Sequence, residues 1–266
     1  MARSAKSGTS FYLFDFDDNI MFLSTTIFVQ NTETKEEVAL STGDFALVHP
    51  QLGRPGNWEN FAIFDGSYRN FRDLPPEETK AGRKQHFVAD VEQAIGAEGT
   101  AWQGPAWEVF VYACRNQRPV SIVTARGHSA RTLKAGVRVL LDRGLIPQEP
   151  NFVSIYPVSN DTVRRKLGDR KLELTTPALK KRAIVRIVED AVREYGVDAE
   201  LRFGMSDDDP ANVALIIRAM SEAKLKYRDK RFFVINTHFD QKVKLEVFPV
   251  DFSVTGSTLL SAEPAK

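Results

Sequence analysis

The chain has 266 residues, of which 42% are hydrophobic and 27% are charged, and its formal net charge is +1. This composition is typical of a globular protein with one large domain, or one domain with an insertion. The near-neutral charge disfavours nucleic acid as a partner but leaves a local basic groove open. A single cysteine, Cys114, excludes an internal disulfide and fits a reducing compartment, so we expect a cytoplasmic protein.

The two ends of the chain are polar and predict little structure. Residues 1–10 lack the apolar core of a secretory signal, and no stretch approaches the ~20 apolar residues of a membrane span. We therefore expect a disordered N-terminus at 1–10, a folded core at 11–250, a flexible tail at 251–266 and no membrane partner. A homo-oligomer stays open.

The first half of the chain begins with an apolar strand at residues 11–16. Two β-prone runs then flank a polar turn, which predicts a hairpin within residues 20–40. Residues 44–80 are rich in proline, glycine and asparagine, so they predict mostly loop. Helical patterns follow at 81–96 and 105–117.

The second half alternates strand and helix. We predict strands at 119–124, 151–157, 201–206 and 231–236 and an edge strand at 244–250. Between them lie predicted helices at 129–143, 161–167, 176–195 and 212–226. This alternation predicts an α/β fold with a mostly parallel sheet and helices on both faces.

Polar clusters follow three of the predicted strands. They are residues 15–19, 124–128 and 207–209. The carboxyl ends of parallel strands share one edge of a sheet, where open α/β sheets bind ligands. Asp15 and Asp17 are two residues apart, so both can project towards one point, and burying their charge unpaired would be costly. A cation such as Mg²⁺, which prefers oxygen ligands, would remove that cost.

These clusters, in their order, resemble the four motifs of the haloacid dehalogenase-like (HAD) superfamily of phosphohydrolases. The matching residues are Asp15 and Asp17, then Thr124 with Ala125 and Arg126, then Lys180 or Lys181, then Asp207 and Asp208. The resemblance covers residues 10–237 and implies a Rossmann-like core. It also implies a flap or small cap inserted after the first strand, for which residues 20–104 give room.

The resemblance implies a Mg²⁺-dependent phosphomonoesterase that forms an aspartyl-phosphate on a phosphorylated substrate. Asp15 would be the nucleophile, and Asp17 would act as general acid and base. The metal would bind the Asp15 side chain, the backbone carbonyl of Asp17 and Asp207, with Asp208 as a further ligand or a partner of one.

The remaining motif residues would hold the phosphate. Thr124 would donate a hydrogen bond to a phosphoryl oxygen, with Ala125 and Arg126 beside it. A lysine would offset the negative charge. We prefer Lys180 to Lys181 because it lies one helical turn before Ile184, closer to the start of the helix.

Other interpretations stay open. Thr124 could cap a turn, residues 207–209 could cap the next helix, and Arg126 could be a surface residue. Asp18, Asn19 and Ser206 depart from the usual pattern of the family. The same motifs fit a phosphotransferase or phosphomutase, and the departures motivate a third hypothesis, a non-catalytic binding protein with the same fold.

Overall fold

A six-stranded sheet forms the centre of the computed structural model, which describes residues 8–237 and 243–248. The strand order is β6-β5-β1-β7-β8-β9. The strands are β1 (Thr9–Phe14), β5 (Pro119–Thr124), β6 (Asn151–Pro157), β7 (Leu201–Asp207), β8 (Arg231–Asn236) and β9 (Val243–Val247). Only the β8–β9 pair is antiparallel among these six strands, which confirms a mostly parallel α/β sheet.

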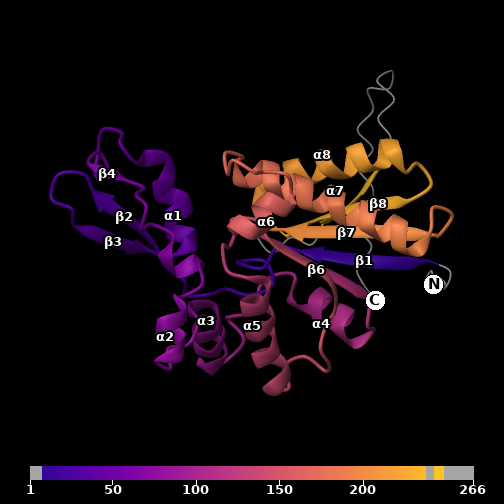
Figure 1. The fold of residues 1–266 in the computed structure, drawn as a ribbon, viewed down its shortest axis with the longest axis horizontal. Helices are drawn as coiled ribbons and strands as arrows, with labels where there is room; N and C mark the ends of the chain where they lie inside the picture. Colours follow the sequence, from indigo (N-terminus) through magenta and orange to yellow (C-terminus); the bar gives the residue numbers. More distant parts are fainter. Residues whose placement is uncertain (1–7, 238–242, 249–266) are drawn as a thin grey trace.

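Helices cover both faces of this sheet (Figure 1). On one face lie α7 (Thr176–Tyr195) and α8 (Pro210–Lys226), and on the other lie α4 (Trp107–Arg115) and α5 (Ala130–Asp142). Side chains of β1 alternate between the two layers: Phe11 and Leu13 pack with α7 and α8, whereas Phe14 packs with α4 and α5. β1 is therefore buried on both faces, and the residues after it emerge in the middle of the carboxyl edge.

A second, smaller sheet follows β1 and forms a separate lobe (Figure 1). Its strands are β2 (Ile27–Asn31), β3 (Glu37–Leu40) and β4 (Phe61–Ala62), and α1 (Thr42–Val48) packs beside them. We call residues 27–72 the insert lobe. Val29, Leu40 and Val48 form its own small core. The β2–β3 pair confirms the predicted hairpin.

The prediction of mostly loop over residues 44–80 was wrong in part. Besides α1, this segment contains the 3₁₀ turns His49–Gln51 and Arg69–Phe71 and the helix α2 (Pro76–Lys80). The Ser41 hydroxyl accepts a hydrogen bond from the Asp44 N–H at 3.0 Å and caps α1. Pro76 occupies the first position of α2, where its missing N–H costs nothing. A proline thus begins a helix in a segment whose proline content predicted a loop.

The remaining boundaries differ little from the predictions. α3 (His86–Gly96) begins five residues later than expected, because Gly82 has a φ of +91° and interrupts the helix. α6 (Asp161–Lys166) and the other helices lie where the sequence placed them. The predicted tail at 251–266 and residues 1–7 lie outside the described residues. The prediction of disorder up to residue 10 was wrong at its end, because Thr9 and Ser10 pair with β7 and belong to β1. Within the described part, we find no helix with the length and apolar character that crossing a membrane requires.

Candidate functional site

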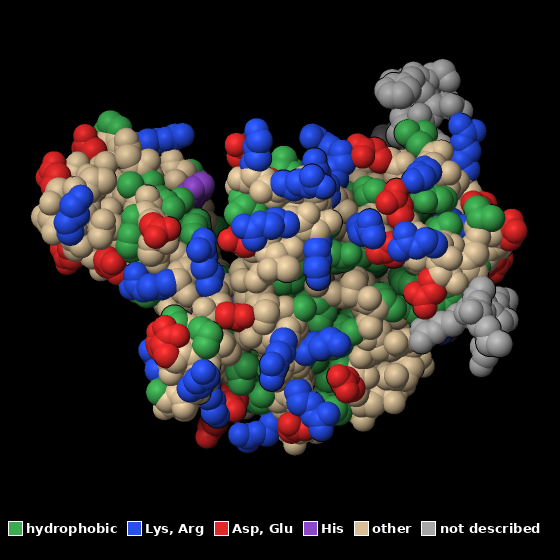
Figure 2. Space-filling model, viewed as in Figure 1, with side chains coloured by type: hydrophobic (Ala, Val, Ile, Leu, Met, Phe, Trp, Pro, Cys, Tyr) green, Lys and Arg blue, Asp and Glu red, His purple; other side chains and the backbone are tan. Residues whose placement is uncertain are grey.

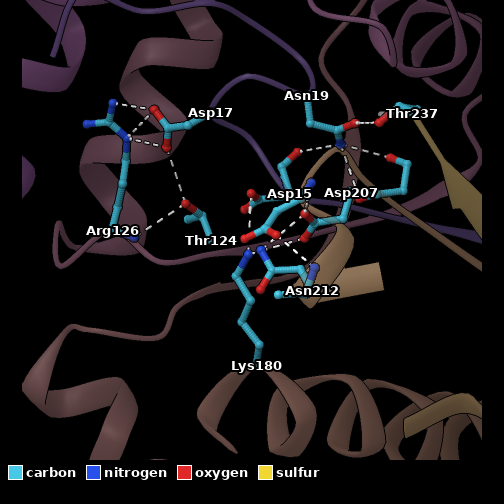
Figure 3. Close-up of polar contacts among 12 residues, drawn as sticks. Asp15, Asp17, Asn19, Thr124, Arg126, Lys180, Asp207, Asn212 and Thr237 are labelled. Atoms are coloured by element: carbon cyan, nitrogen blue, oxygen red, sulfur yellow. Dashed lines mark hydrogen bonds and ion pairs between the residues drawn. The ribbon is translucent and has the colours of Figure 1, made fainter. Parts of the chain in front are cut away.

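Strand register brings the acidic residues together at the carboxyl edge of the sheet. β1 pairs with β7 so that Phe14 lies opposite Ser206. The next residues, Asp15 and Asp207, consequently emerge side by side, with Thr124 at the end of β5 on the other side of β1 (Figure 3). The ends of β5, β1 and β7, which carry three of the four motifs, are thus neighbours in space.

Asp15, Lys180, Asp207 and Asp208 form what we call the acidic cluster. Carboxylate oxygens of its three aspartates lie within 4.8 Å of one another, close enough to hold a metal ion together. Lys180 is 2% exposed, and its Nζ lies 3.3 Å from Asp15 Oδ2 and 3.2 Å from Asp207 Oδ2. The Asp15 Oδ1 atom is buried and has no hydrogen-bond partner among the described residues.

Burial dominates the electrostatics of this cluster. It raises the pKa of Asp15 well above its ordinary value; Lys180 opposes the shift and Asp207 adds to it. Burial also raises the pKa of Asp208 to about 7, with a further contribution from Asp207. Burial disfavours the charged form of Lys180, but Asp15 and Asp207 more than compensate and raise its pKa. Three carboxylates share one ammonium, so the cluster has more negative than positive charge. One of their oxygens, Asp15 Oδ1, also lacks a hydrogen-bond partner among the described residues. Both features fit a cation that binds oxygen ligands.

The side chain of Asp17 points away from this cluster towards Arg126 (Figure 3). Arg126 Nε lies 2.9 Å from Asp17 Oδ2, and Nη2 lies 2.6 Å from Oδ1. Nη2 also donates to Thr25 Oγ1 at 2.6 Å, and the rings of Phe71 and Phe87 lie 4.7 and 4.8 Å from the guanidinium. We call these five residues the arginine cluster. Arg126 is fully buried, which rules out the alternative of a surface arginine, and its predicted role in substrate binding stays a prediction.

The Asp17 carboxylate thus lies outside the carboxylate group that could hold an ion, and the predicted ligand from Asp17, its backbone carbonyl, stays a prediction. Thr124 stands beside it: its Oγ1 donates to Asp17 Oδ2 at 3.5 Å and accepts from the Arg126 N–H at 3.3 Å. Ala125, which lies between Thr124 and Arg126 in the chain, is exposed and lines the cleft described below. Thr124 is itself only 1% exposed, yet it belongs to the lining of that cleft.

Asn19 and Ser206, the departures from the family pattern, bond to each other. The Asn19 Nδ2 donates to Ser206 Oγ at 2.9 Å and to the carbonyl oxygens of Ser206 and Asp15 at 3.1 Å each. The Asn19 Oδ1 accepts from Thr237 Oγ1 at 2.9 Å. This buried amide ties the ends of β1, β7 and β8 together and fixes Asp15 beside Asp207. The sequence signal from which this contact could have been predicted is that both departures are polar and lie at the ends of neighbouring strands.

Of the two candidate lysines, the structure brings only Lys180 into the acidic cluster. Lys181 forms an ion pair with Glu222 on α8 at the surface. His128 is buried against Phe87, and its two ring nitrogens have no hydrogen-bond partner in the described part of the chain. Burial together with Arg126 lowers its pKa to about 3. His128 is therefore a neutral packing residue.

An open cleft of about 820 Å³ gives access to the site. The side of the cleft formed by the central sheet and α7 includes Asp15, Asp17, Thr124 and Lys180. The insert lobe lines the opposite side with six residues that sequence reasoning did not identify: Ile27, Thr42, Ala46, Tyr68, Phe71 and Arg72. Figure 2 shows the hollow between the insert lobe and the body of the molecule.

Comparison of the chain with protein-family models, with curated proteins and with solved structures found no match in any of the three. The resemblance to the HAD superfamily stays a hypothesis that is founded on four motifs and on their shared position at one sheet edge.

Proposed function

We propose that this protein is a Mg²⁺-dependent phosphohydrolase with a HAD-like core, acting on phosphomonoesters through an aspartyl-phosphate at Asp15. One observation carries the proposal. A buried carboxylate oxygen without a hydrogen-bond partner, Asp15 Oδ1, lies in a cluster that combines Lys180 with two further aspartates on the wall of an open cleft. An apolar protein interior does not retain such an arrangement for stability alone.

Asp15, Asp207 and Asp208 would hold the metal ion. When bound, Mg²⁺ supplies the positive charge that lets a phosphate dianion approach these carboxylates. Lys180 keeps its ammonium between Asp15 and Asp207 and adds positive charge beside the nucleophile. Asn212 and the Asp209 N–H each donate to Asp207 Oδ1 at 3.1 Å and so orient that carboxylate.

Asp15 attacks phosphorus, and the bond between phosphorus and the leaving oxygen breaks. In its protonated form, with one oxygen released from Arg126, Asp17 would give a proton to the leaving oxygen. A water molecule then gives a proton to Asp17 and hydrolyses the aspartyl-phosphate, which restores Asp15 and releases phosphate. Arg126 is a positioning residue in this scheme, since it holds both oxygens of Asp17. Thr124 donates its hydroxyl to a phosphoryl oxygen in place of Asp17.

Phosphate release from a panel of phosphomonoesters, with and without Mg²⁺, tests the proposal. We expect Mg²⁺-dependent release by the wild type and a loss of at least about 10³-fold in Asp15→Asn. Asp198→Asn, a change at an exposed aspartate remote from the cleft lining, is the matched control and should keep full activity. Undiminished release by Asp15→Asn, or no release from any substrate in Mg²⁺, contradicts the proposal.

A further inference from the structure

The cleft is much larger than a phosphoryl group. Its volume of about 820 Å³ is in the range of sites that enclose a whole small ligand. The acidic cluster occupies the sheet edge, and the insert lobe contributes Tyr68, Phe71 and Arg72. The insert lobe therefore contributes the part of the site that the leaving portion of a substrate would meet.

Four cationic side chains line this cleft: Arg72, Arg126, Arg164 and Lys180. Three of them are neutralised by carboxylates. Arg126 is paired with Asp17, Lys180 with Asp15 and Asp207, and Arg164 with Asp169 at 2.8 Å. Arg72 differs: it is exposed, and within residues 8–237 and 243–248 its guanidinium forms neither an ion pair nor a hydrogen bond.

The position of Arg72 is fixed by a close approach between two chain segments. The preceding residue, Phe71, accepts a hydrogen bond through its carbonyl oxygen from the Gly127 N–H at 2.9 Å. A Cβ atom on Gly127 would lie only 3.2 Å from Arg72 Cγ, so a glycine here lets the end of the insert lobe rest on the loop after β5. Arg72 thus stands next to the loop that carries Thr124 and Arg126.

Arg72 is the cationic side chain of this lining that no carboxylate neutralises among the described residues. Asp18, Asp161 and Asp209 line the same cleft, and they would repel an anionic leaving group unless a cation compensates. An arginine with an unoccupied planar fork suits a carboxylate or a phosphate, which it can bind through two hydrogen bonds.

We propose that Arg72 binds a second anionic group on the leaving portion of the substrate. The substrates would accordingly be phosphomonoesters that carry a carboxylate or a second phosphate besides the phosphate that is removed. This inference rests on the proposed function of the same site. It assigns specificity to the insert lobe and not to Arg126, which Asp17 already occupies.

Two matched ligand pairs test the inference by binding, without dependence on turnover. The pairs are 3-phosphoglycerate with glycerol 3-phosphate, and adenosine 3′,5′-bisphosphate with adenosine 5′-monophosphate; in each, the first member has the extra anionic group. Affinities are measured by calorimetry in Mg²⁺ in an Asp15→Asn background, where the ligand cannot be consumed. The compared variants carry Arg72→Ala, Arg72→Lys or the control Arg54→Ala, which removes an exposed arginine of the insert lobe outside the cleft lining.

For at least one pair, we expect tighter binding of the doubly anionic member and a loss of about tenfold or more in Arg72→Ala. Its singly anionic partner should change less than about threefold, Arg72→Lys should recover part of the loss, and Arg54→Ala should resemble the parent. An equal loss for both members would assign Arg72 to the transferred phosphate and overturn the inference. Absence of binding, or unchanged binding in Arg72→Ala for both pairs, would overturn it as well.

Turnover separates this inference from the proposed function. Discrimination that depends on Arg72, with no phosphate release by the protein with Asp15 intact, would preserve the anion subsite and reject the phosphohydrolase. Release without discrimination would preserve the phosphohydrolase and reject the subsite.

Discussion

The acidic cluster and the arginine cluster differ in the balance between their positive and negative charges. The acidic cluster gathers three carboxylates around one ammonium, whereas the arginine cluster matches the Asp17 carboxylate with one guanidinium. Asp15 and Asp17 are two residues apart in the chain, yet one is left with an orphaned oxygen and the other has both oxygens bound. Different surroundings thus leave Asp15 with an oxygen open to a cation and give both oxygens of Asp17 a partner.

This difference predicts different responses to perturbation. The acidic cluster should depend on an added cation and on pH, because its negative charge exceeds its positive charge. The stability of the arginine cluster should depend on both Arg126 and Asp17, because removing either one leaves a buried or partly buried charge without its partner. The following predictions address first one cluster and then the other.

After Asp15→Asn, replacing Lys180 should have the largest effect on turnover. Lys180→Met removes the only ammonium in contact with Asp15 and Asp207 among the described residues. We expect phosphate release to fall by about 10²–10³-fold, the usual loss for one preorganised charge at a reacting centre. Steady-state phosphate release at saturating Mg²⁺ measures this. A loss below tenfold would mean that the ammonium has no role in the reaction.

Replacing Arg126 should have the largest effect on stability. Arg126→Met leaves Asp17 without its partner and should lower the free energy of unfolding by about 3 kcal/mol in urea titrations. Adding Asp17→Asn should recover part of that loss, since no uncompensated carboxylate then remains. The control is Arg138→Met, which removes an exposed ion pair with Asp142 and should leave the urea midpoint unchanged. Equal effects of Arg126→Met and Arg138→Met would contradict the buried pairing.

The stability of the metal-free protein should depend on pH through the acidic cluster. Folding raises the pKa of Asp208 from its ordinary value near 3.8 to about 7. A raised carboxyl pKa stabilises the fold below the ordinary value, and this contribution is lost as the pH rises towards 7. In EDTA, Asp208→Asn should therefore lose less thermal stability than the wild type between pH 4 and 7. Identical pH profiles for the two proteins in thermal melts would exclude this contribution.

The smallest expected effect belongs to Lys181. Its surface pair with Glu222 should contribute less than about 0.5 kcal/mol, and phosphate release by Lys181→Met should equal that of the wild type. Urea unfolding and phosphate release should be measured side by side for Lys180→Met and Lys181→Met. The comparison shows whether the two neighbouring lysines differ in their contributions to stability and turnover. A loss of turnover in Lys181→Met comparable to that in Lys180→Met would refute the assignment.

Local sequence patterns predicted the elements of the central sheet because strand and helix periodicities are short-range properties. The apolar run that ends at Asp15, the strand that ends at Thr124 and the helix between Pro177 and Gly196 all lie where their residues predicted them. The insert lobe was harder to predict because α1 depends on a single capping serine in a segment rich in proline and glycine.

The sequence by itself determined which polar residues reach the carboxyl edge of the sheet, since strand ends and parallel connections fix that edge. Only the tertiary structure decided what each residue meets there. Arg126 pairs with Asp17 across 109 residues of chain, Asn19 bonds Ser206 across 187, and Lys180 rather than Lys181 faces Asp15. Such contacts depend on strand register and helix rotation, and a shift of one residue in either would exchange a buried charge for an exposed one.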